Sequence, residues 1–172
     1  MSDATVSPPS ELFVDSVGHT AWKAFWLPLL LTIAKHSVNG SRDIRQRAIG
    51  YLQRVLLSSQ VLPEQGQDTA LAAVFSRVLF PVVDELLKPQ IYNQDPSSME
   101  ETRLRASALV CKAFLQYLAP LSENPDKLIE TFLKIVDLME RFMRTGSRQQ
   151  VSTDRAESHA YQTAKLVCDH LL

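Results

Sequence analysis

The most constraining feature of this sequence is a proline-containing apolar segment that occurs twice. Residues 25–30 read F-W-L-P-L-L, and residues 78–83, which lie 53 positions further along, read V-L-F-P-V-V. In both copies the proline lies inside an apolar run with helical spacing, where proline removes one backbone hydrogen bond. We therefore expect two related helices, each kinked at its proline, in a chain built from repeated helical units.

A second pair of segments repeats after the proline segments, at a shift of 60 residues. Each copy has an aliphatic residue, then arginine, then alanine three positions later. We expect Ala48 and Ala108 to let neighbouring helices approach closely. Arg45 and Arg105 are expected to brace adjacent hairpins through acidic or carbonyl groups, with Arg45 on the solvent-facing side or at its margin. The matched residues are Ile44, Arg45, Ala48, Leu52 and Val55 in the first copy and Leu104, Arg105, Ala108, Lys112 and Leu115 in the second.

Apolar residues at helical spacing predict six helices. A cap at Ser41 opens the second helix, and a capping box of Ser98 and Glu101 opens the fourth. Asn124, followed by proline at the first helical position, opens the fifth. The expected ranges are 20–37, 41–58, 69–87, 98–119, 125–144 and 153–172, with a polar loop at 90–97. We expect a flexible N-terminal segment at 1–19 and a helical-repeat domain at 20–172, with hairpins at about 20–58, 69–119 and 125–172.

The same spacing predicts which side of each helix faces the core. Trp22 and Trp26 are interpreted as core anchors of the first hairpin, with an exposed binding cleft as the alternative. The residues predicted to point inward are Ile44, Ala48, Leu52, Val55 and Leu56 on the second helix, Leu71, Val74, Phe75, Val78, Val82 and Leu86 on the third, Leu104, Ala108, Cys111, Leu115 and Leu118 on the fourth, and Leu128, Phe132, Ile135, Met139 and Phe142 on the fifth.

Repeated hairpins of this kind resemble HEAT repeats, in which a proline-kinked first helix is followed by a second helix that reads aliphatic-Arg-x-x-Ala. The resemblance implies an all-α, HEAT/armadillo-like, right-handed solenoid of helical hairpins with about six main helices. An isolated up-and-down helical bundle is the alternative fold.

Composition and motifs argue against several classes of function. Eighteen basic and nineteen acidic residues give a net charge of −1, which argues against nucleic-acid binding. Two cysteines, Cys111 and Cys168, are too few for a disulfide framework or a cysteine-based zinc site. No apolar run approaches the roughly 18 residues that a membrane span needs. Phosphate-binding glycine loops, nucleophile elbows and paired metal-binding histidines are also missing. We therefore expect no catalytic residue, no metal site, no cofactor and no enzymatic activity.

Several phrases in the sequence resemble the region downstream of the Sec7 domain in large Arf guanine-nucleotide exchange factors, and most of all the Golgi branch of the Gea, GBF and GNOM type. The resemblance covers residues 22–143, whereas the tail at 145–172 departs from the pattern. The catalytic Sec7 motif F-R-L-P-G-E is absent, so no active residue carries over. The phrases are I-A-K-H at 33–36, S-R-D-I-R-Q-R-A at 41–48, Y-L-Q-R-V-L-L at 51–57, V-L-F-P at 78–81, M-E-E-T-R-L-R-A at 99–106 and K-A-F-L-Q at 112–116.

The resemblance implies a homology-downstream-of-Sec7 segment that regulates an exchange domain and helps recruit it to Golgi membranes. The expected partners are small GTPases of the Arf or Rab type or other parts of the parent exchange factor, in the cytoplasm at the periphery of the Golgi. No helix is both strongly cationic and strongly amphipathic, so we expect weak or absent direct membrane binding. The binding residues and the oligomeric state stay open. A generic HEAT-type scaffold domain of a transport or assembly protein is the alternative function.

Overall fold

The computed structural model describes residues 20–147 except 59–60, 64–65 and 94. The predictions for the N-terminal segment 1–19 and the sixth helix at 153–172 therefore lie outside the described residues. Within the described residues every regular element is helical, as predicted. The elements are η1 (Trp22–Trp26), α2 (Leu27–His36), α3 (Arg42–Leu56), α4 (Gln67–Ala73), η2 (Val74–Leu79), α5 (Phe80–Leu86), α6 (Pro89–Tyr92), α7 (Pro96–Gln116), α8 (Leu118–Ser122) and α9 (Pro125–Ser147).

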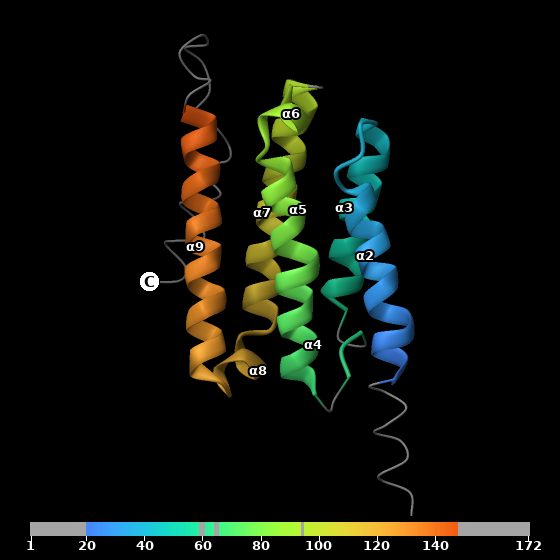
Figure 1. Cartoon of the computed structure of the whole chain (residues 1–172), viewed down its shortest axis with the longest axis vertical. Helices are drawn as coiled ribbons and strands as arrows, with labels where there is room; N and C mark the ends of the chain where they lie inside the picture. The colour runs from blue at the N-terminus through green and yellow to red at the C-terminus, as the bar shows by residue number, and fades with distance from the viewer. Residues whose placement is uncertain (1–19, 59–60, 64–65, 94, 148–172) are drawn as a thin grey trace, which may run out of the picture.

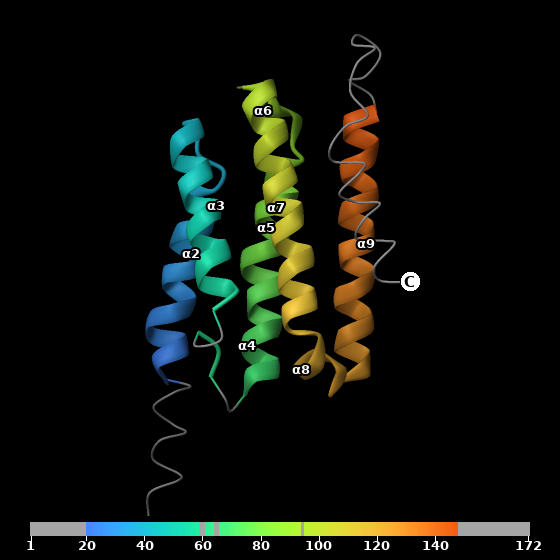
Figure 2. The ribbon, with the colours of Figure 1, turned by 180° about the vertical axis from the view of Figure 1, so that it is seen from behind.

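The helices stack in two layers. Figure 1 shows α2, the continuous rod of α4, η2 and α5, and α9 side by side, whereas Figure 2, turned by 180°, shows α3 and α7 in front of the first two. α2 packs on α3 and α5 packs on α7, and neighbouring hairpins meet through α2 with η2 and through α3 with α7. Each hairpin thus buries one surface within itself and another against its neighbour, which is the packing of an all-α solenoid of helical hairpins.

Both proline-containing helices respond to proline by widening one turn. The N–H of Leu27 donates to the carbonyl of Trp22, and the N–H of Phe80 donates to the carbonyl of Phe75. Each is a π-type bond that spans five residues, and each donor directly precedes a proline. Proline has no N–H to donate to the carbonyl four residues earlier, so the preceding segment pairs in the wider register. The sequence predicted a kink, and the structure shows a π-helical segment, η1 or η2, in each repeat.

The second helices of the two hairpins match at a shift of 58 residues, so the shift of 60 predicted from the sequence is wrong. Ile44 and Leu115, both expected in the core, are 43% and 46% exposed. Leu118 is also exposed and belongs to α8, because α7 ends at Gln116. Sequence matching paired the aliphatic residues and missed that arginine and serine occupy inward positions of α7. The equivalent buried residues are Arg45, Ala48, Ile49, Leu52 and Leu56 in α3 and Arg103, Ala106, Ser107, Val110 and Phe114 in α7.

The start of α7 also differs from the prediction. The helix begins at Pro96, and the carboxylate of Asp95 accepts the N–H of Ser98, so the cap is Asp95 and the predicted capping box of Ser98 and Glu101 is wrong. Asp95, followed by proline at the first helical position, caps the helix in place of Ser98, which lies three residues later. The expected loop at 90–97 therefore contains the end of α6 and the start of α7. The predicted cap at Asn124 is confirmed, because its Oδ1 accepts the N–H of Lys127.

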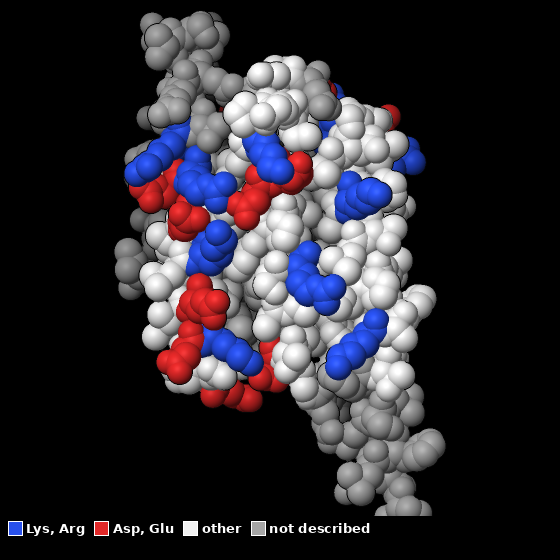
Figure 3. Space-filling model, in the orientation of Figure 1, with Lys and Arg blue, Asp and Glu red and all other residues white. Residues whose placement is uncertain are grey.

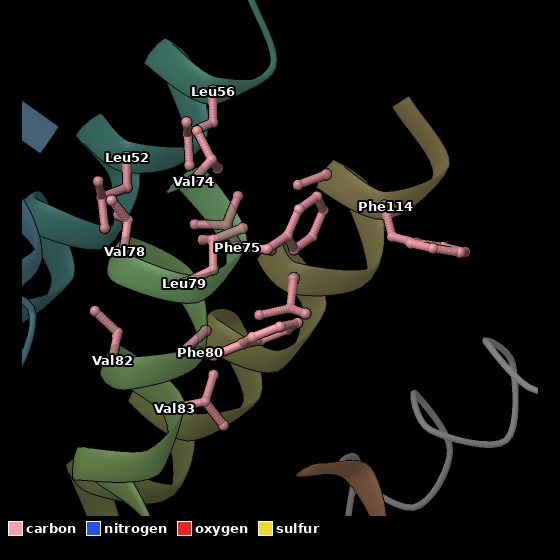
Figure 4. Close-up of a cluster of buried hydrophobic side chains, with 14 of the residues drawn as sticks. Leu52, Leu56, Val74, Phe75, Val78, Leu79, Phe80, Val82, Val83 and Phe114 are labelled. Carbon is pink, nitrogen blue, oxygen red and sulfur yellow. The ribbon is translucent and has the colours of Figure 1, made fainter. Parts of the chain in front are cut away.

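The core is centred on the rod of α4, η2 and α5, which is covered from two sides. In Figure 4, Val74 and Val78 point toward Leu56 and Leu52 of α3, whereas Phe75 points toward α7. All six inward residues predicted for this helix are buried. Trp22 is 3% exposed and belongs to the core, whereas Trp26 is half-buried and packs edge-to-face against Phe25. On α9, the fully buried Leu138 adds to the predicted set.

Candidate partner-binding groove

A groove of about 790 Å³ lies between the central rod and α9. The short helix α8 contacts both α4 and α9 and holds them apart at one end. Phe75, Phe80 and Pro81 form part of the apolar floor. The groove therefore exists because the chain turns through α8 before α9 begins. Its other lining residues include Asp68, Ser76, Asp84, Leu121, Asn124, Lys127, Glu130, Thr131, Leu133, Lys134 and Asp137.

The rim of this groove carries charges of both signs that pair across it. Lys127 Nζ lies 2.9 Å from Asp68 Oδ2, and Arg141 forms an ion pair with Asp84. The hydrogen bond from Lys127, together with the backbone N–H of Thr69, lowers the pKa of Asp68 below its usual value. Figure 3 shows red and blue side chains intermingled over α9. An apolar floor with a mixed, self-compensating rim is typical of a surface that binds polypeptide.

The described lining of the groove consists of apolar, hydroxyl, amide, carboxylate and lysine side chains. Neither histidine nor cysteine occurs among its described lining residues, and the hydroxyl of Ser76 donates to the carbonyl of Ala72 in its own helix at 2.6 Å. Across the described ranges, no three side chains of the ligand types come together in a way that could hold a metal ion. Nor does any helix in those ranges have the length and apolar character needed to cross a membrane.

A buried arginine locks the two hairpins together. The side chain of Arg45 is fully buried, and its Nη1 donates to the carbonyls of Asn39 and Gly40 at 2.9 and 2.8 Å. On the α7 side, Nη2 donates to Ser98 Oγ at 2.8 Å, and Nε lies 3.4 Å from Thr102 Oγ1. The prediction that Arg45 braces neighbouring hairpins is confirmed, and its expected position at the solvent-facing margin is wrong. Hydrogen bonds from every guanidinium nitrogen offset the cost of burying the charge.

The same junction continues to the surface through Glu101. Its carboxylate accepts hydrogen bonds from Arg42 at 3.0 Å and from Gln46 at 2.8 Å, both on α3. The hydrogen bond from Arg42 is the largest cause of the lowered pKa of Glu101. Segments 41–48 and 99–106, which carry much of the sequence resemblance, therefore meet at one hairpin junction.

Arg105 does not brace the next hairpin, which corrects the prediction. It is exposed and bonds to Glu101 one turn earlier in α7, at 2.7 Å. Arg103 occupies the equivalent position to Arg45. It is 5% exposed, and its Nε donates to the carbonyl of Leu86 at 2.6 Å. Arg45 thus holds carbonyls of the loop that follows α2, whereas Arg103 holds the carbonyl of the last residue of α5.

The family model described as "GBF1-like, tetratrico peptide repeat region" matches residues 26–159. The chain belongs to this family. The hairpin spacings of 53 and 58 residues are longer than the roughly 34 residues of a tetratricopeptide repeat and also exceed the roughly 40–47 of HEAT repeats, although stacked helical hairpins are common to all three.

Three curated relatives support the same family assignment. The chain is 32% identical to the Golgi-specific brefeldin A-resistance guanine nucleotide exchange factor 1 homolog of Caenorhabditis elegans, over 73% of the chain and 6% of that protein. It is 30% identical to the ARF guanine-nucleotide exchange factor GNOM of Arabidopsis thaliana, over 77% of the chain and 9% of that protein, and 27% identical to the Arabidopsis exchange factor GNL1, over 72% and 8%. No solved structure matches the chain.

The comparisons confirm the resemblance to the Gea, GBF and GNOM branch. The chain is a helical module of the Arf exchange-factor family, and it spans less than a tenth of the length of these relatives. The sequence predicts neither a partner-binding residue nor the groove between the rod and α9. Its walls come from positions 68–84 and 120–137, and only the turn through α8 brings them to face one another.

Proposed function

We propose that this chain is a non-catalytic regulatory or recruitment module of an ARF guanine-nucleotide exchange factor in Golgi vesicle traffic, and that it works by binding protein partners. The single observation that carries the proposal is membership of the GBF1-like family by a region built of stacked helical hairpins. The motifs shared with this family meet at the junction around Arg45, where they hold hairpins together. Their role is therefore to maintain the shape of a binding scaffold.

The proposed partners are small GTPases of the Arf or Rab type, or other parts of the parent exchange factor. The groove between the central rod and α9 supports this, because its paired charges and apolar floor suit a folded or helical polypeptide. The name of the nematode relative, a Golgi-specific exchange factor homolog, supports a cytoplasmic location at the periphery of the Golgi. Direct attachment of this piece to lipid is proposed to be weak or absent.

The proposal is tested with the parent exchange factor and a groove-filling variant. Ser76→Arg with Thr131→Arg inserts two bulky cations into the groove without touching the buried core. The matched control is Glu100→Arg with Gln116→Arg, at exposed positions of α7 in the other layer. We expect the groove variant to reduce Golgi localisation or cellular Arf-GTP, with the control unchanged.

Three results would count against the proposal. Nucleotide exchange on Arf by the purified 172-residue chain would show that the module is catalytic. Unchanged localisation and Arf-GTP in the groove variant would remove this groove from the function. A parent gene without a Sec7 domain would favour the generic scaffold function instead.

A further inference from the structure

A second groove lies between the two proline-containing helices, in the same layer as the first. Two hollows of about 320 and 300 Å³ open between η1–α2 and η2–α5, and both are lined by Leu31 and Arg77. Pro28 contributes to one hollow, and Pro81 and Val82 to the other. Because Leu31 and Arg77 line both, the two mainly apolar hollows are neighbours between the helices, and together they are termed the channel.

The charges along this channel are cationic. Lys23 on η1 and Lys35 on α2 stand on one wall, and Arg77 on η2 stands on the other. All three side chains are exposed, and in the described part of the chain none of them forms an ion pair or a side-chain hydrogen bond. The carboxylate of Glu85, at one end, is already paired with Lys88 at 2.6 Å. Figure 3 shows blue side chains that stand apart from red ones on the half of the face away from α9.

This arrangement contrasts with the groove beside α9. There Lys127 and Arg141 are paired with aspartates across the rim. In the channel, Lys23, Lys35 and Arg77 are not paired with carboxylates of the described residues. The channel therefore has a positive electrostatic potential above an apolar floor. Such a surface favours a partner that brings negative charge and apolar side chains together.

The spacing of the cations defines the shape of that partner. Lys23 and Lys35 are 12 residues apart in one helix, which corresponds to about 18 Å along its axis. A helix lying in the channel presents apolar side chains downward and carboxylates along both edges, toward cations on both walls. An extended strand alternates its side chains between two opposite faces and cannot match both walls and the floor at once.

We propose that the channel between η1–α2 and η2–α5 binds an acidic amphipathic helix of a partner protein. This inference goes beyond the proposed function, because it depends on the charge and shape of the channel and not on exchange-factor regulation. The two apolar hollows receive apolar side chains of the bound helix. The three cations receive its flanking carboxylates.

The test uses the full 172-residue chain and a designed probe. The probe is a fluorescently labelled helical peptide with leucine at positions i, i+4, i+7 and i+11 and glutamate along both edges. We expect saturable binding by fluorescence anisotropy that weakens as salt rises. The triple variant Lys23→Glu, Lys35→Glu and Arg77→Glu is expected to bind about tenfold more weakly, since each exposed ion pair contributes modestly. The matched control reverses Arg47, Arg54 and Lys112, exposed cations of α3 and α7, and keeps the affinity of the parent chain.

Other outcomes overturn the inference. Absence of binding to the glutamate probe does so, as does equal loss in both triple variants. Equal affinity for a probe with lysine in place of glutamate would show that charge does not select the ligand. Stronger association with phosphatidylserine vesicles than with the peptide, lost in the channel variant, would assign the cations to a lipid surface instead. Circular dichroism of each variant verifies that it is folded, and these surface changes leave the buried residues intact.

Discussion

At the scale of single residues, buried polar contacts decide how the hairpins join. Arg45 is fully buried, yet each of its guanidinium nitrogens has an oxygen partner on its own loop or on α7. Lysine could not make the same set of hydrogen bonds, because its ammonium group has one nitrogen whereas the planar guanidinium group has three. The position therefore requires arginine for its geometry as much as for its charge.

Removal of this side chain is expected to be costly. Arg45→Ala leaves the carbonyls of Asn39 and Gly40 and the hydroxyl of Ser98 without their donor, and should lower the free energy of unfolding by about 3 kcal/mol. Arg45→Lys should recover only part of the loss. The control Arg105→Ala removes an exposed pair within one helix and should cost less than about 1 kcal/mol. Urea unfolding measures all three, and equal losses at the two positions would contradict the junction described here.

The surface part of the junction predicts a dependence on acid. The pKa of Glu101 is lowered from its ordinary value of 4.5, first by Arg42 and also by Arg105. A lowered pKa in the folded state means that this contribution to stability is complete above pH 4.5 and is lost as the pH falls through the folded pKa. Glu101→Gln should therefore destabilise the chain at pH 7 and make its stability depend less on pH below 4.5. Thermal unfolding of both proteins between pH 7 and 3 tests this, and an unchanged acid dependence would contradict it.

At the scale of elements, the inward face of α7 is the main correction that the structure makes. Phe114 is 3% exposed and packs against Phe132 with ring centroids 6.1 Å apart, whereas its neighbour Leu115 is 46% exposed. The sequence pattern predicts that Leu115 is buried, because it aligns α7 with α3 at a shift of 60 residues. The shift in the structure is 58 residues. Only packing against α5 and α9 identifies the residue that is covered.

This register gives a sharp comparison between neighbours. Phe114→Ala should lower the free energy of unfolding by roughly 3–5 kcal/mol, because it opens a cavity between α7 and α9. Leu115→Ala should change it by less than about 1 kcal/mol, because that side chain is largely in solvent. Chemical denaturation of the two variants decides the register. A larger loss of stability for Leu115→Ala than for Phe114→Ala would support the register of α7 that the sequence predicts.

At the scale of the whole molecule, the solenoid is covered unevenly. The central rod contacts α2 through η2 and α7 through both η2 and α5, whereas α9 leaves a row of apolar side chains exposed at Ile129, Leu133, Val136 and Met143. Solenoids gain stability from nearest neighbours, so a helix with fewer neighbours opens more readily. The row on α9 marks the described end of the stack.

Hydrogen exchange should reveal this gradient. Amides of α4, η2, α5 and α7 are expected to exchange slowest, and amides of α2 and α9 should exchange faster at the two ends of the stack. Mass spectrometry of peptides after native-state exchange measures the order. Uniform protection across all of these helices would indicate a single cooperative bundle and would contradict the solenoid energetics.

The sequence by itself determined the helical class, the repeated proline helices and the family. Apolar side chains at helical spacing leave few other ways to bury themselves, and proline constrains its own backbone wherever it occurs. The complete inward set of the third helix followed from this, because that helix is buried on two sides and a shifted register would expose large apolar residues.

The tertiary structure alone decided the register of α7, the cap at Asp95 and both grooves. On α7 the inward side includes Arg103 and Ser107, and polar residues reveal their burial only through the partners they meet. The grooves depend on distances between helices, which α8 and the stacking of hairpins set. Local spacing determines which side of a helix is apolar, whereas the neighbouring helices determine which part of it is covered and where a partner can bind.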